Sequence, residues 1–96
     1  MSPAKQKKLD NLRKKLDNLD NSFIKLIKKR TNLVNEVLKL KNYKNQIVDK
    51  KRIKIILNKI KKKSIKKNID PKITKRIWKN MIWSYIDYEK RNFKKK

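Results

Sequence analysis

The side chains best suited to chemistry in this sequence are charged residues that fall on otherwise apolar helix faces. Arg30 lies between Leu26 and Leu33, at a position where the three-and-four spacing of a long apolar stripe calls for another apolar residue. Glu89 falls on a second apolar face, four residues after Tyr85. An unpaired buried charge costs more free energy than packing returns. The sequence therefore indicates an anion bound beside a long helix.

Two further cations belong to the same group. Lys41 follows Arg30 by eleven residues, which is about three helical turns, so both project from one side of the helix. Arg52 opens the next helix, just across a loop from Lys41. Two interpretations are open. Arg30 and Glu89 form a buried salt bridge while Lys41 and Arg52 extend to solvent, or the group is a pocket for a small polyanion.

Several kinds of catalysis are disfavoured by composition. The chain has no His, Cys or Gly, so it offers no zinc ligand set and no glycine-rich loop for a nucleotide. We therefore expect no metal and no cofactor. The two interpretations of the charged group, a buried salt bridge and a pocket for a small polyanion, both stay open.

The element that must position these residues is a long helix from Lys5 to about Lys41. Its apolar stripe is formed by Leu9, Leu12, Leu16, Leu19, Phe23, Leu26, Leu33, Val37 and Leu40. About 37 residues at ~1.5 Å each make a rod of roughly 55 Å, whereas a compact domain of this size has a radius of gyration of about 12–13 Å. We therefore expect a second copy of the chain to cover the stripe, in a homodimer with antiparallel or crossed long helices.

Two shorter helices follow, and both have a clear start. Residues 42–48 read as a loop, and Asp49 is a good N-cap for a helix that fades in the lysine-rich run 61–67. Asp70 and Pro71 together predict the start of a third helix. We expect residues 1–5 and 94–96 to be tails. The prediction is one all-α domain over residues 1–96, with a long, a short and a medium helix.

The net charge of +24 resembles that of a nucleic-acid-binding protein. Most of the cations are Lys, and the accompanying bias to Asn and Ile is what an AT-rich genome encodes. We expect weak, non-specific attraction to polyanions, with run 61–67 as a solvated helix end.

The N-terminus has no apolar segment of a signal peptide and no apolar run approaches the length of a membrane span, so a cytoplasmic location is expected.

The ordered set of motifs resembles the all-helical chorismate mutase family. The resemblance rests on residues 12–20 (Leu-Arg-Lys-Lys-Leu-Asp-Asn-Leu-Asp), 26–30, 37–41, 49–52 and 69–89, and covers about residues 9–93. It implies an intertwined homodimer of three-helix chains that rearranges chorismate to prephenate in aromatic amino-acid biosynthesis.

The same resemblance implies roles for individual residues. Arg13 of the partner chain and Arg30 would hold the two carboxylates of the substrate. Lys41 would donate to the ether oxygen of the breaking bond, with Glu89 on the other side of that oxygen. The remaining substrate-binding residues implied by the family pattern are Asp49, which would orient the ring hydroxyl, Arg52, on the carboxylate side, and Tyr85.

Two departures from the family pattern leave an alternative substrate open. Ile53 stands where these mutases usually have Glu, and the spacing from Lys41 to Arg52 is one residue shorter than usual. Both features, and residues 83–86, resemble the isochorismate-pyruvate lyases, which share the fold and release salicylate and pyruvate. A third and more remote alternative is a basic helical dimer that binds nucleic acid. Charges on apolar faces disfavour that alternative, because a nucleic-acid binder keeps its charges outside.

Overall fold

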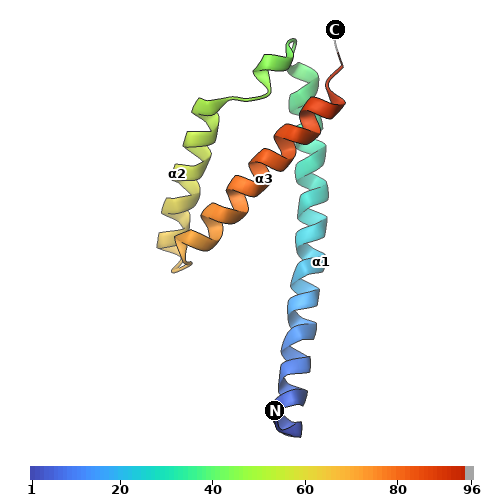
Figure 1. Cartoon of the computed structure of the whole chain (residues 1–96), viewed down its shortest axis with the longest axis vertical. Coiled ribbons are helices and arrows are strands. Elements are labelled where there is room, and N and C mark those ends of the chain that lie inside the picture. Colours follow the sequence, from blue (N-terminus) through green and yellow to red (C-terminus); the bar gives the residue numbers. More distant parts are fainter. Residues whose placement is uncertain (95–96) are drawn as a thin grey trace. The chain divides into compact units, whose positions relative to one another are not determined.

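The computed structural model describes residues 1–94, and that part of the chain is helical without strands. Helix α1 (Pro3–Leu40) is followed by a short 3-10 helix η1 (Lys44–Gln46), then by α2 (Lys50–Lys66) and α3 (Pro71–Asn92) (Figure 1). The predicted all-α class with a long, a short and a medium helix is confirmed. Lys94 lies beyond the end of α3, whereas residues 95 and 96 of the predicted tail lie outside the described residues.

The chain divides into two units, Met1–Leu33 and Val34–Lys96, each with its own internal contacts. The single domain over residues 1–96 therefore stays a prediction. Helix α1 begins at Pro3, within the residues predicted as an N-terminal tail. Ser2 caps the helix: its Oγ accepts from the amide of Lys5 at 3.3 Å and its carbonyl from the amide of Gln6 at 2.9 Å. Proline also suits the first helical position, where no amide hydrogen is needed.

The second unit holds the apolar core. Leu38 at the end of α1, Ile47 in the loop, and Ile82 and Ile86 of α3 are buried together. Side chains from the loop, α2 and the end of α3 pack around them: Val48, Ile53, Ile56, Leu57 and Phe93. Helices α2 and α3 also pack against each other. This core packs the end of α1 against α3, which is where the candidate site lies.

Both predicted caps are confirmed by hydrogen bonds. Asp49 Oδ1 accepts from the amide of Arg52 at 3.0 Å, and Asp70 Oδ1 accepts from the amide of Lys72 at 2.9 Å. These bonds satisfy amides that the first turn of a helix leaves without a partner. The lysine-rich run is the exposed end of α2 and its turn, as expected, except that Ser64 within it is buried.

The turn between α2 and α3 is fixed by polar contacts. Asn68 adopts a left-handed conformation with φ 57°, a role that glycine usually fills at helix ends and that asparagine tolerates. The buried Ser64 hydroxyl shares a 2.7 Å hydrogen bond with the Thr74 hydroxyl, linking α2 to α3.

No described helix carries an apolar stretch long enough to cross a membrane.

Candidate active site

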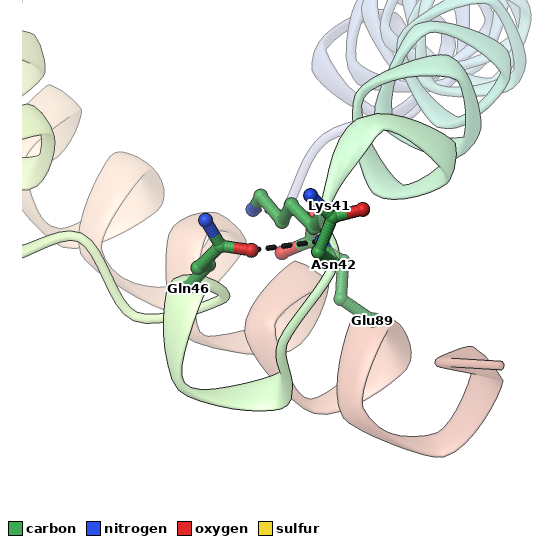
Figure 2. Close-up of polar contacts among 4 residues, drawn as sticks. All are labelled: Lys41, Asn42, Gln46 and Glu89. Atoms are coloured by element: carbon green, nitrogen blue, oxygen red, sulfur yellow. Dashed lines mark hydrogen bonds and ion pairs between the residues drawn. The ribbon is translucent and has the colours of Figure 1, made fainter. Parts of the chain in front are cut away.

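A buried ion pair between Lys41 and Glu89 is the centre of the candidate site. Lys41 Nζ donates to Glu89 Oε1 at 3.2 Å, and the two side chains retain 19% and 8% of their exposure. Figure 2 shows Lys41 and Glu89 beside the loop that carries Asn42 and Gln46. Two further ion pairs of the described residues, Lys39 with Glu36 and Arg91 with Asp87, lie on the surface. Glu89 thus has the cationic partner that its position on an apolar face requires, and that partner is Lys41.

Lys41 is held by the backbone around it. It follows the last residue of α1, and its amide donates to the carbonyl of Leu38 at 3.1 Å. In the turn that follows, Gln46 Oε1 accepts from the amide of Asn42 at 2.8 Å (Figure 2). The same oxygen also accepts from the amide of Tyr43 at 2.9 Å. The predicted loop over residues 42–48 therefore contains an ordered 3-10 turn, and this turn fixes the base of the Lys41 side chain.

Glu89 is held by the apolar face of α3. Ile82 and Ile86 precede it by seven and three residues and are buried in the core, so helical spacing turns Glu89 toward the same side. Among the described residues, no buried side-chain nitrogen or oxygen lacks a hydrogen-bond partner. The site is therefore a satisfied polar contact at the edge of a hydrophobic core.

The start of α2 carries two more of the predicted site residues. Asp49 and Arg52 are both exposed and share the first turn of α2, where one carboxylate oxygen of Asp49 is occupied as the cap. Ile53 is partly buried and packs against the core. The predicted roles of Asp49 and Arg52 toward a substrate stay predictions.

Tyr85 is partly buried and belongs to a small polar and aromatic cluster that the sequence did not reveal. Its ring lies edge-on to that of Tyr88, with centroids 6.4 Å apart. The Tyr88 hydroxyl donates to Asn35 Oδ1 of α1 at 2.9 Å. Neither Asn35 nor Tyr88 was among the predicted site residues. The available signal was positional: Tyr88 precedes Glu89 directly, and Asn35 shares a helix side with Leu38 and Lys41.

Arg13 and Arg30 lie in the first unit, on α1. Arg13 is exposed and Arg30 is partly buried. Their predicted roles in holding substrate carboxylates stay predictions. The described residues contain no group of three or more Asp, Glu, His or Cys side chains arranged to hold a metal ion.

Comparison with known proteins gives an independent line of evidence. The model of the family described as chorismate mutase type II matches residues 12–90. A chorismate mutase from Methanocaldococcus jannaschii is 37% identical over 76 residues, which cover 78% of this chain and 77% of the relative. No solved structure matches significantly. The chain therefore belongs to the chorismate mutase type II family, a family of enzymes that act on chorismate.

Proposed function

We propose that this enzyme rearranges chorismate to prephenate at a site centred on Lys41 and Glu89. The observation that carries the proposal is the ion pair of these two side chains at 3.2 Å, at the edge of the only apolar core in the described part of the second unit. A buried ion pair adds little to stability when compared with apolar packing. Its presence here is better explained by a use in chemistry.

The reaction needs few groups. It is a unimolecular pericyclic rearrangement, so no nucleophile and no metal take part. The protein folds a flexible dianion into its reactive conformer and stabilises the negative charge that develops on the ether oxygen. The Lys41 ammonium donates to that oxygen, and Glu89 can donate to it only when protonated, because a carboxylate and an ether oxygen both only accept.

The substrate carboxylates need further cations. Following the family pattern, we assign them to Arg30 and to Arg13 of a second copy, with Arg52 in support. Asp49 keeps one carboxylate oxygen beyond its cap and is assigned to the ring hydroxyl. Tyr85 is assigned to the wall of the pocket. These assignments rest on the resemblance and on the residue types.

A homodimer is part of the proposal. Leu19 and Phe23 of α1 are 58% and 60% exposed in the single chain, and the other exposed apolar residues of the predicted stripe in the first unit are Leu12, Leu16, Leu26 and Leu33. Monomeric proteins rarely leave so long an apolar strip in water. A second copy of α1 offers a complementary strip of equal length. Sedimentation at micromolar concentration tests this, and a stable folded monomer of 11.7 kDa would contradict it.

Isochorismate-pyruvate lyase activity is the second candidate, favoured by one observation. Ile53 stands where mutases usually carry a glutamate that accepts from the ring hydroxyl, and its side chain packs against the core. An isoleucine cannot accept from the ring hydroxyl, so the site depends less on the position at which chorismate carries that hydroxyl.

We also propose weak attraction of polyanions to the surface of α2 and the first half of α3. Between Lys50 and Lys79 the chain has fourteen cationic side chains and one acidic side chain, Asp70. None of the described ion pairs involves these cations. Binding to a fluorescent DNA duplex should be lost as salt rises from low to physiological concentration, because counterion release dominates such binding. Salt-resistant binding would contradict a purely non-specific interaction.

The central experiment uses purified protein with chorismate and, separately, isochorismate, and identifies the products. Prephenate from chorismate supports the proposal, and salicylate with pyruvate from isochorismate supports the second candidate. Lys41→Gln should abolish the activity. Lys44→Gln, three residues away in the exposed turn η1, is the matched control and should keep it. Equal activity of the two variants would refute the assignment of Lys41.

A further inference from the structure

Two polar side chains outside the proposed catalytic set join α1 to α3 next to the Lys41–Glu89 pair. Tyr88 Oη donates to Asn35 Oδ1 at 2.9 Å, in a partly buried contact between residues 53 positions apart. We infer that Asn35 and Tyr88 are positioning residues, which hold Glu89 in register with Lys41 and so set the geometry of the reaction centre. This inference rests on the proposed function.

The contacts between α1 and α3 follow one another along α1. Asn35, Leu38 and Lys41 are spaced by three residues and therefore lie on one side of the helix end. Asn35 bonds Tyr88, Leu38 joins the buried cluster with Ile82 and Ile86, and Lys41 bonds Glu89. The apolar middle contact is flanked by two hydrogen bonds that reach adjacent residues of α3.

This arrangement fixes the rotation of α3 as well as its distance from α1. Apolar packing is largely non-directional, so Leu38, Ile82 and Ile86 alone leave some freedom to slide or rotate. Tyr88 and Glu89 differ by about 100° around the axis of α3. Each of them forms a hydrogen bond to a residue at the end of α1, and the two bonds together restrict the rotation of α3. The edge-on contact with Tyr85 further limits the ring of Tyr88. Catalytic geometry must be held within about 0.5 Å, which explains the need for a directional contact here.

The test removes one hydroxyl. Tyr88→Phe should lower kcat about three- to tenfold, the range that loss of one hydrogen bond corresponds to. KM for chorismate should stay unchanged, because the substrate carboxylates are assigned to other residues. Tyr43→Phe removes a hydroxyl from an exposed tyrosine and should leave kcat unchanged.

A double-mutant cycle separates positioning from stability. Asn35→Ala raises helix propensity, so a loss of activity there cannot come from a weaker helix. Asn35→Ala should lower kcat about as much as Tyr88→Phe, and the double variant should be no worse than either alone. Additive losses would overturn the inference. An unchanged kcat with a lowered Tm would also overturn it, because the pair would then serve only stability.

Failure of the proposed function can be told apart from failure of this inference. If the unaltered protein folds but does not convert chorismate, the proposed function is wrong. The pair is then judged by NMR on protein labelled with ¹³C at the Glu carboxyl carbons. Tyr88→Phe and Asn35→Ala should both shift the Glu89 resonance, and Tyr43→Phe should not. An unmoved Glu89 resonance in both variants would overturn the inference.

Discussion

Replacing Lys41 by Met is the substitution that best separates the stability of the site from its chemistry. Methionine keeps the length of the side chain but removes its charge, so the Glu89 carboxylate loses the ammonium that lies 3.2 Å away. Replacing both residues, as Lys41→Met with Glu89→Leu, removes the pair altogether. The single and double variants should differ sharply in stability and agree in having no activity.

The magnitude follows from the burial of the pair. Removing one partner of a fully buried ion pair costs about 3–5 kcal/mol, whereas replacing both by apolar residues is often neutral or stabilising. The Lys41 side chain keeps 19% of its exposure and Glu89 keeps 8%, so water reaches the pair in part. We therefore expect a loss of about 2–3 kcal/mol for Lys41→Met. For a domain of this size that is a fall in Tm of roughly 10–20 °C.

Urea unfolding, followed by circular dichroism at one fixed protein concentration, measures this difference, because the stability of a dimer depends on concentration. The double variant should recover to within about 1 kcal/mol of the unaltered protein and still fail to convert chorismate. Lys44→Met in the exposed turn is the control and should change neither property. A double variant as unstable as Lys41→Met would refute the reasoning about the pair. Full activity in either variant would refute its catalytic use.

Three further outcomes test the rest of the site. Arg30→Ala should abolish turnover, because a charged contact in a dry site contributes several kcal/mol. Steady-state kinetics on the folded variant measure this, and unchanged activity would exclude Arg30 from the site. Inactive Arg13→Ala and Arg30→Ala proteins, mixed and refolded, should regain activity in part, since one site of a heterodimer keeps both arginines; heterodimers without activity would place Arg13 elsewhere. Glu89→Gln keeps the shape of the side chain and supplies a permanent N–H donor, so it should stay active in an assay of chorismate turnover; a folded but inactive Glu89→Gln would show that Glu89 acts as an anion.

Local signals in the sequence were sufficient for the helix boundaries of the second unit. Asp49 and the Asp70-Pro71 pair cap their helices as predicted, because capping is a contact between residues two or three positions apart. The same chemistry at Ser2 and Pro3 starts α1 inside the predicted tail. Each of these helix starts is decided by residues within a few positions of it.

The pairing inside the site was beyond the reach of local patterns. The charge pattern placed Glu89 on an apolar face and offered Arg30 as its partner in a buried salt bridge, whereas the structure pairs Glu89 with Lys41. Lys41 and Glu89 are separated by 48 residues, and Asn35 and Tyr88 by 53. Such contacts depend on how α3 packs against the end of α1, which periodicity alone does not specify. The polar residues Asn35 and Tyr88 carry no sequence signal of a shared hydrogen bond.

The left-handed turn at Asn68 bears on which amino-acid types this fold needs. Among the described residues Asn68 alone has a positive φ, and the sequence contains no Gly, Cys or His. This fold therefore forms without the three residue types that many small domains need: Gly for tight turns, Cys for disulfides, and Cys or His for metal sites. Its helices are joined by one 3-10 turn and one turn at Asn68. Such a fold tolerates the strong Lys, Asn and Ile bias that an AT-rich genome imposes.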